Sequence, residues 1–232
     1  MITAKTASLP KLYRPTAQRR VVREVARSIF RGLFYLLSRI KIAGHENVPS
    51  HGPYMVVFNH VSIYDPPVVL AFWPYQLEIL GAVEVWSRKG QAFLARLWGG
   101  IPIRRTEIHR EAIDQTLSVL RSGLPLLISP EGGRSHLPGL RKAKTGVVYI
   151  AEVSKVLIIP VGLTGTTDDF FQRAIQGYQP RIEMTIGQPF TLPEALDDQT
   201  LLPREVRQRK ADYIMSRIAA LLPPAYRGYY NV

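Results

Sequence analysis

The sequence predicts a single α/β domain with a mixed, largely parallel sheet flanked by helices, together with an N-terminal basic amphipathic helix. Short apolar runs alternate with segments of helical periodicity, which is the pattern of an α/β fold. Several runs are apolar throughout, as in strands that are buried on both faces of a parallel sheet. A chain of 232 residues, 46% of them hydrophobic, suits one domain with a sizeable core. We divide it into an arm and helix, residues 1–42, and the α/β domain, residues 43–232.

The segment from Gln18 to Ile42 has the periodicity of an amphipathic helix. Apolar residues share one face, at three- and four-residue steps: Val22, Val25, Ile29, Leu33, Leu36 and Ile40. Arginines fall on the opposite arc: Arg19, Arg20, Arg23, Arg27 and Arg31. The apolar stretches are too short to cross a bilayer. We therefore expect a helix at the membrane surface, where anionic lipids add about 1 kcal/mol per basic residue. The alternative is an ordinary surface helix packed on the domain.

Charge and composition narrow the classes of partner. The formal net charge is +12, and the segment between Lys11 and Lys41 holds nine Lys or Arg and one acidic residue. This balance indicates an anionic partner: a membrane surface, a phosphorylated substrate or nucleic acid. Nucleic acid is not expected, because the arginines are not interleaved with aromatic platforms. The absence of cysteine excludes disulfides, thiolate metal sites and a cysteine nucleophile.

Two strands and two helices are expected in the first half of the domain. Tyr54–Phe58 is apolar throughout and follows a turn-rich loop, so we predict a strand. A short helix over residues 67–73 should end near Pro74. Leu77–Val83 is the next apolar run and predicts a strand. The helical pattern of residues 84–98 ends at a pair of glycines.

The second half repeats this alternation. Three apolar runs and one alternating run predict strands at residues 101–105, 124–129, 156–163 and 181–186. Helical periodicity predicts helices at residues 107–121, 145–153 and 204–222.

A histidine and an aspartate follow the first of these strands. His60 and Asp65 are five positions apart, and such positions in a straight helix point about 140° away from each other. The two side chains meet only if His60 lies on the turn that leaves the strand, with Asp65 as N-cap of a helix beginning at Pro66. A carboxylate that accepts the Nδ1 hydrogen leaves Nε2 free to take a proton, as in a general base. The alternative is a loop histidine beside a capping carboxylate.

Charged side chains follow two further strands. Arg104 and Arg105 end one strand, and their guanidinium donors are suited to binding a phosphate. The alternative is that they form a basic strand end exposed to solvent. Another strand runs into a Pro-Glu-Gly-Gly-Arg-Ser turn, residues 130–135. Its glycines allow the backbone to approach a ligand closely, and Glu131 and Arg134 lie at the strand's exit.

Four blocks, in order, resemble the glycerolipid acyltransferase family, which includes the 1-acylglycerol-3-phosphate acyltransferases. The blocks are residues 59–65 (Asn-His-Val-Ser-Ile-Tyr-Asp), 100–105, 129–135 and 159–162. The resemblance covers about residues 40–190. Three residues depart from the family's pattern: Arg104 stands where Asp is usual, Ser129 where Phe is usual and Gly133 where Thr is usual. These departures change the pocket that should hold the acyl acceptor.

The resemblance implies transfer of a fatty acyl group from acyl-CoA or acyl carrier protein to a free hydroxyl of a lysophospholipid. The expected acceptor is 1-acylglycerol-3-phosphate, which gives phosphatidic acid. His60 would be the general base, oriented by Asp65. The expected acceptor-binding residues are Arg105, Glu131, Gly132 and Arg134, with Arg104 and Lys144 in support. The thioester is a co-substrate, and neither a cofactor nor a metal is required.

Other functions share part of this pattern. The acceptor could instead be another lysophospholipid, glycerol-3-phosphate, or a glyco- or aminolipid, and water in its place would make the protein an esterase. A non-enzymatic, membrane-bound lipid-binding protein would share the basic helix but would not need the histidine–aspartate spacing. We expect a peripheral, monotopic protein that contacts anionic lipids, on the cytoplasmic face of a bacterial inner membrane.

Overall fold

The computed structural model describes residues 12–88, 90–103 and 110–231. Among these residues, seven strands form one sheet in the order β1-β7-β6-β2-β5-β3-β4. The strands are β1 Arg39–Ala43, β2 Tyr54–Phe58, β3 Glu78–Ala82, β4 Ile101–Ile103, β5 Leu126–Ile128, β6 Leu157–Thr164 and β7 Arg181–Ile186. Neighbouring strands are parallel except β6 and β7, which are antiparallel. The prediction of a mixed, largely parallel sheet is confirmed, and the carboxyl ends of the parallel strands β2 to β6 share one edge.

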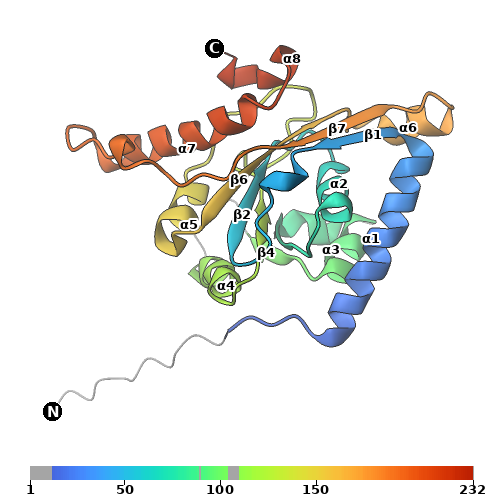
Figure 1. The fold of residues 1–232 in the computed structure, drawn as a ribbon, viewed down its shortest axis with the longest axis horizontal. Helices are drawn as coiled ribbons and strands as arrows, with labels where there is room; N and C mark the ends of the chain where they lie inside the picture. The colour runs from blue at the N-terminus through green and yellow to red at the C-terminus, as the bar shows by residue number, and fades with distance from the viewer. Residues whose placement is uncertain (1–11, 89, 104–109, 232) are drawn as a thin grey trace.

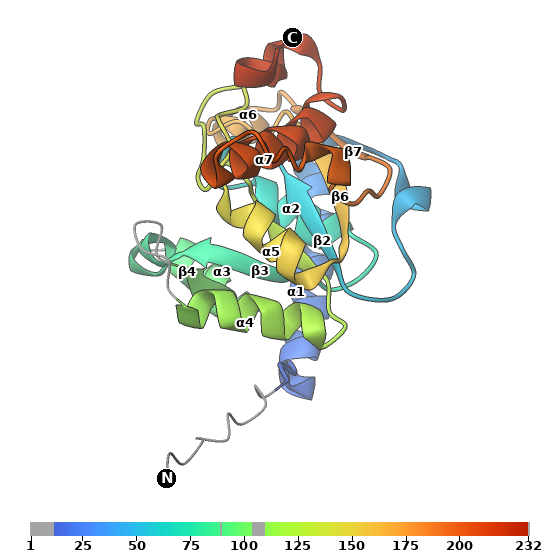
Figure 2. The ribbon, with the colours of Figure 1, turned by 90° about the vertical axis from the view of Figure 1, so that its left-hand side faces the viewer.

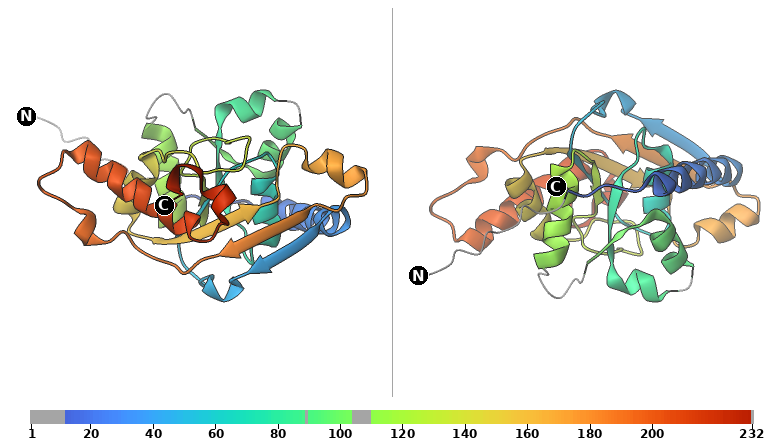
Figure 3. Two further views of the ribbon diagram at one scale, coloured as in Figure 1. Left: turned by 90° about the horizontal axis from the view of Figure 1, so that it is seen from above. Right: turned by 90° about the horizontal axis from the view of Figure 1, so that it is seen from below.

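Helices cover both faces of this sheet. They are α1 Ala17–Leu37, α2 Asp65–Phe72, α3 Gln91–Trp98, α4 Arg110–Arg121, α5 Gly146–Ser154, α6 Phe170–Ile175, α7 Pro203–Ala219 and α8 Pro224–Arg227. In Figure 1, α1, α2 and α3 lie to the right of the sheet, and α4, α5 and α7 lie to its left. Figure 2 shows α4, α5 and α7 from the front, and the view from below in Figure 3 shows α1 along one side of the domain.

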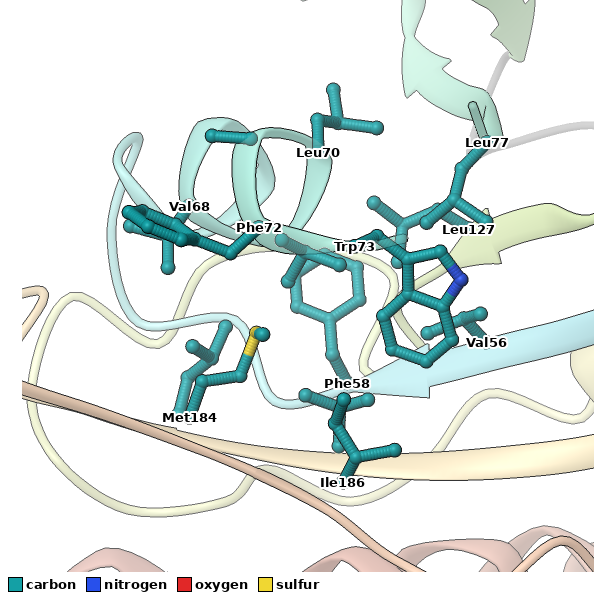
Figure 4. Close-up of a cluster of buried hydrophobic side chains, with 14 of the residues drawn as sticks. Val56, Phe58, Val68, Leu70, Phe72, Trp73, Leu77, Leu127, Met184 and Ile186 are labelled. Atoms are coloured by element: carbon teal, nitrogen blue, oxygen red, sulfur yellow. The ribbon is translucent and has the colours of Figure 1, made fainter. Parts of the chain in front are cut away.

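The central strand β2 is buried on both faces. Val56 and Phe58 belong to the core that contains α2, and Met55 and Val57 to the core that contains α5 and α7. This two-sided burial explains why β2 is apolar at every position instead of alternating. Figure 4 shows Val56 and Phe58 packed with Phe72 and other side chains of the first core.

The helix α1 packs with its arginine face inward. Arg23 forms a buried ion pair with Glu78 of β3, and its Nε donates to the carbonyl of Trp98 at 2.8 Å. Arg27 and Arg31 donate to backbone carbonyls at the carboxyl end of α2 (Leu70, Ala71 and Trp73). The row of apolar residues faces outward instead: Val21, Val25, Ile29, Leu33, Tyr35 and Leu36 are exposed. Guanidinium groups satisfy carbonyls left free at a helix end, which explains this orientation.

The end of the first predicted helix differs from the structure. The first helix was expected to reach Ile42, but it ends at Leu37, and Arg39–Ala43 forms β1. The backbone turns to an extended conformation at Ser38, whose N–H and hydroxyl both donate to the carbonyl of Phe34. The sheet therefore begins upstream of the division placed at residue 42. Among the described residues, no helix is both long and apolar enough to cross a bilayer.

The other differences lie around α3 and α6. The helix expected over residues 84–98 is divided into a 3₁₀ turn, Val83–Ser87, and α3. Gly90, at φ 80°, separates the two, because a left-handed backbone cannot continue a right-handed helix. The short helix α6 was not predicted. The helix expected over residues 107–121 is present from Arg110, and residues 107–109 lie outside the described residues.

Candidate active site

The imidazole and carboxylate that follow β2 meet on the turn that leads to α2. Nδ1 of His60 lies 2.8 Å from Oδ2 of Asp65. The Asp65 side chain is fully buried, whereas that of His60 keeps 17% of its surface exposed. The carboxylate orients the ring with Nδ1 toward it, so Nε2 is the ring nitrogen left for a substrate.

Asp65 was expected to be an N-cap, and this was wrong. It is the first residue of α2, and Tyr64 occupies the cap without a side-chain hydrogen bond. The two residues that follow Asp65 are prolines, which have no N–H group that the carboxylate of Asp65 could accept as a cap. Its Oδ2 instead accepts the backbone N–H of Ser62 at 2.7 Å. Its Oδ1 is buried with no hydrogen-bond partner among the described residues.

Glu131, which follows β5, holds the His60 turn from inside the protein. Its Oε1 accepts the backbone N–H of His60 at 2.8 Å, and its Oε2 accepts that of Arg141 at 2.8 Å. The residue is 2% exposed. Burial raises the pKa of Glu131 to about 7, although both N–H bonds lower it. These contacts favour a positioning role for Glu131, and its binding to the acceptor stays a prediction.

Asn59 anchors the same turn to the neighbouring strand β6. Its Nδ2 donates to the carbonyl of Leu163 at 2.9 Å, and its Oδ1 accepts the N–H of Leu163 at 2.7 Å. The amide thus replaces a pair of ladder hydrogen bonds where β2 ends. Asn59 and Glu131 together fix the backbone of His60 from two strands that are distant in the sequence.

A cavity of about 430 Å³ lies beside His60. Much of its wall is apolar and includes Phe30, Phe58, Leu70, Leu80, Val85, Trp86, Leu94 and Trp98. Polar side chains come from two segments: Glu84, Arg88 and Gln91 around the start of α3, and Ser129, Arg134, His136 and Arg141 after β5, where Gly132 and Gly133 also line the cavity. An apolar cavity with a few polar groups beside an imidazole suits a ligand with an alkyl chain and a polar end. A wider depression of about 710 Å³ shares Trp86, Ala95 and Gly100 with this cavity, but His60 does not line it.

The predicted acceptor-binding residues are distributed unevenly around this cavity. Gly132 and Arg134 line it with His60. Lys144 is exposed beside the turn, and its backbone N–H donates to the carbonyl of Pro130 at 2.8 Å. Arg104 and Arg105 lie outside the described residues.

Two cavity residues were missed by the sequence analysis. Arg141 reaches back to the turn, where its Nη1 donates to the carbonyl of Arg134 at 3.0 Å. His136 comes directly after the third block and lines the same cavity. The available signal was proximity in sequence to the Pro-Glu-Gly-Gly turn. Among the described residues, no group of three or more His, Cys, Asp or Glu is placed to hold a metal ion.

The family whose sequence model matches this chain is described as Acyltransferase, and the match covers residues 39–164, more than half of the chain. The chain is 29% identical over 146 residues to a 1-acyl-sn-glycerol-3-phosphate acyltransferase of Streptococcus pneumoniae, covering 61% of this chain and 51% of that protein. It is 25% identical over 139 residues to the enzyme of the same name from Borreliella burgdorferi, covering 59% of this chain and 56% of that protein. The chain thus spans about half the length of these relatives.

A solved structure has the same fold. The crystal structure of the 1-acyl-sn-glycerophosphate acyltransferase from Thermotoga maritima matches with a TM-score of 0.61. The match has 22% sequence identity and covers 88% of this chain and 83% of that chain.

Proposed function

Because the chain belongs to the acyltransferase family, we propose that it transfers a fatty acyl group from a thioester to the free hydroxyl of a lysophospholipid. The observation that carries this proposal is the 2.8 Å contact between His60 and Asp65 at the wall of a largely apolar cavity. Acyl transfer to a hydroxyl needs both features: a base for the hydroxyl proton and an apolar space for the chain.

His60 acts as the general base. Its Nε2 takes the proton of the acceptor hydroxyl while the hydroxyl oxygen attacks the thioester carbonyl carbon. The carbon–sulfur bond then breaks, an ester forms, and the departing thiolate takes the proton from the imidazolium. Asp65 stabilises the charged ring during these steps. A positioned base of this kind contributes about 10²–10⁴-fold to the rate.

The acceptor that we propose is 1-acylglycerol-3-phosphate, on the basis of the relatives' names, with phosphatidic acid as the product. Arg134 and Arg141 supply positive charge to the cavity wall for its phosphate. Acyl-CoA and acyl carrier protein both fit as the donor. Arg104 and Arg105 remain predicted contributors to phosphate binding.

One observation favours a different acceptor as the second candidate. Ser129 lines the cavity, and its hydroxyl is buried with no hydrogen-bond partner among the described residues. A phenylalanine at this position, as the family resemblance leads one to expect, would fill space that Ser129 leaves open. An acceptor with an additional hydroxyl or amino group would satisfy this serine.

The outward apolar face of α1 supports a place at the membrane. Leu36 is 73% exposed and Ile29 57% exposed, and both belong to the row that faces away from the domain. We propose that this face enters the bilayer interface, with the cytoplasmic face of a bacterial inner membrane as the expected location. Arg23 and Arg27 are buried, so attraction to anionic lipids falls to exposed basic residues such as Arg20 and Arg39.

The test is acyl transfer from a labelled long-chain acyl-CoA, and from the matching acyl carrier protein thioester, to a panel of lysolipids. We expect the wild type to acylate 1-acylglycerol-3-phosphate and His60→Ala to lose this activity. Transfer to another acceptor, still dependent on His60, would keep the mechanism and select the second candidate. No transfer from either donor, or full activity in the variant, would overturn the proposal.

A further inference from the structure

A second imidazole–carboxylate pair lies at the cavity, outside the four sequence blocks. Nδ1 of His136 lies 2.8 Å from Oδ2 of Asp168, a residue of the loop between β6 and α6. His136 lines the cavity together with His60 and Arg134. The mechanism proposed above uses neither member of this pair.

Backbone hydrogen bonds hold His136 beside the catalytic turn. The N–H of Ser135 donates to the carbonyl of His60 at 2.8 Å, and the N–H of His136 donates to the carbonyl of Val61 at 3.0 Å. These two bonds fix the segment that carries His136 against the segment that carries the general base. The main chain therefore fixes the backbone of His136 relative to that of His60.

The backbone at His136 is in the left-handed region, with φ 65°. Residues other than glycine adopt this backbone conformation at some cost in free energy, and histidine, asparagine and aspartate are the ones most often found there. Such conformations concentrate at ligand sites, where surrounding contacts maintain them. At His136 the maintaining contacts are the bond to Val61 and the pair with Asp168.

The pair with Asp168 contributes little to stability by itself. The side chain of His136 is 57% exposed and that of Asp168 44% exposed. Exposed ion pairs contribute about 0–1 kcal/mol. Their arrangement at a cavity that is also lined by His60 and three arginines is better explained by a ligand.

Arg134 shares the carboxylate of Asp168 with His136. Its Nη1 lies 3.9 Å from Oδ1, which is too long for a hydrogen bond and leaves the guanidinium donors available. Asp168 occupies Nδ1 of His136, so a protonated ring presents its Nε2 hydrogen to the ligand. A guanidinium and an imidazolium beside one another suit a group that has several anionic oxygens, such as a phosphomonoester.

We propose that His136, oriented by Asp168, binds the phosphate of the acyl acceptor together with Arg134 and determines the preference for a phosphomonoester head group. This inference rests on the proposed acyl transfer for its biological setting. It adds a specificity-determining residue that no block of the sequence resemblance contains. Asp168 is a positioning residue, because it acts through the ring of His136.

The test compares His136→Asn with the wild type, because asparagine tolerates the left-handed backbone and removes only the imidazole. Steady-state acyl transfer is measured with 1-acylglycerol-3-phosphate and with a monoacylglycerol, which has no phosphate. We expect the KM for 1-acylglycerol-3-phosphate to rise about tenfold or more, as for a lost hydrogen bond to a charged group. We expect kcat to change little, and the KM for the monoacylglycerol to be unchanged.

Two further variants separate the positioning role of Asp168 from a general effect on folding. Asp168→Asn should raise the same KM by a smaller factor, because the amide oxygen still accepts the Nδ1 hydrogen. His51→Asn makes the same chemical change in an exposed loop residue before β2, at the opposite edge of the sheet, and should leave both KM values unchanged. Equal effects of His136→Asn on both acceptors, or no effect on either, would overturn the proposal.

A direct binding measurement tests the role of His136 without requiring turnover. Trp86 and Trp98 line the cavity, so their fluorescence can report occupancy in a His60→Ala background. Binding of 1-acylglycerol-3-phosphate should weaken about tenfold or more when His136→Asn is added, and binding of the monoacylglycerol should not change. Inorganic phosphate at millimolar concentration should compete with the first ligand if the site recognises phosphate itself. If the wild type transfers no acyl group, the proposed function fails, and this binding comparison still decides the role of His136.

Discussion

The carboxylate of Glu131 accepts the backbone N–H of His60 at 2.8 Å, across 71 positions of the sequence. Burial raises the pKa of this carboxyl from an ordinary value of 4.5 to about 7. A group next to the turn that carries His60 therefore changes charge near neutral pH. The hydrogen bond connects the titration of Glu131 to the position of His60.

Replacing Glu131 should change how stability depends on pH. Below pH 4.5 the carboxyl is protonated in both the folded and the unfolded protein, and its contribution is fully present. As the pH rises, the unfolded chain ionises first, so the folded state loses about 3 kcal/mol by the time the pH has passed 7. In Glu131→Gln this loss is absent. Urea unfolding of both proteins at about pH 5 and about pH 8 measures it.

The expected result is that the stability advantage of the wild type over Glu131→Gln shrinks between these two pH values. Glu183→Gln, at a half-exposed position of β7 away from His60, is measured as the control for removal of a carboxylate. A pH-independent difference for Glu131→Gln would contradict the raised pKa.

Asp65→Asn should leave the turn folded but impair the base. The amide would no longer compensate the charge of the imidazolium at Nδ1. We expect kcat to fall by about 10²–10⁴-fold, with a small change in KM for the acceptor. Steady-state kinetics with 1-acylglycerol-3-phosphate measure kcat and KM separately, and circular dichroism monitors the fold. Full activity in the variant would show that Asp65 does not assist His60.

Polar substitutions on the exposed face of α1 should release the protein from vesicles. Ile29→Ser and Leu36→Ser each remove apolar surface that points away from the domain, and each should weaken binding about tenfold or more. Because Arg23 and Arg27 are buried, exposed basic residues such as Arg20 should supply the part of binding that depends on salt. Flotation with vesicles of neutral and anionic lipid checks both points. The control is Val153→Ser, an exposed apolar position of α5 on the other side of the sheet from α1, and an equal loss of binding in that variant would contradict the assignment.

The buried ion pair between Arg23 and Glu78 should be costly to break from one side. Arg23→Met leaves a buried carboxylate without its partner and should destabilise the fold by about 3–5 kcal/mol. The double substitution with Glu78→Gln should recover part of this loss. Urea unfolding of the wild type, the two single variants and the double variant gives the coupling free energy between Arg23 and Glu78. As a control, Arg181→Met in the more exposed pair with Glu183 should lower the free energy of unfolding by under about 1 kcal/mol. Equal losses at both pairs would contradict the burial of the first.

Gly81→Ala should shorten the acyl chain that the cavity accepts. A Cβ atom at Gly81 would lie 2.9 Å from the ring of Trp86, so the indole must shift within the cavity that both residues line. Gly100→Ala is the matched control, since its Cβ would make contacts no closer than 3.4 Å. Activity with acyl donors of increasing length should show a shorter optimum for Gly81→Ala and an unchanged one for Gly100→Ala. Identical profiles in all three proteins would show that Trp86 does not limit chain length.

The sequence allowed most of the strands to be predicted, because strands buried on both faces need apolar residues at every position, as in Tyr54–Phe58. The meeting of His60 and Asp65 was also predictable, since it depended on a local spacing and on proline chemistry. The strand β1 was missed because Ile40 fits both the helical period of the preceding residues and the alternation of the strand itself.

Other features depend on contacts between distant segments. The inward face of α1 was not predictable, because the arginines find their partners in Glu78 and in the carboxyl end of α2. Burial of Glu131 likewise depends on β5 lying next to β2. His136 was missed because its partner, Asp168, is 32 residues away in a separate loop.

The amide of Asn59 spans 104 positions to reach Leu163. During synthesis, the segment that carries His60 and Asp65 leaves the ribosome long before β6 exists to hold it. Closing such distant contacts is entropically slow, so parallel sheets of this kind form late in folding. A nascent chain that has not reached β6 therefore has His60 and Asp65 but not the arrangement in which we propose that they act. The proposed acyl transfer would then require the assembled sheet as well as the presence of these residues.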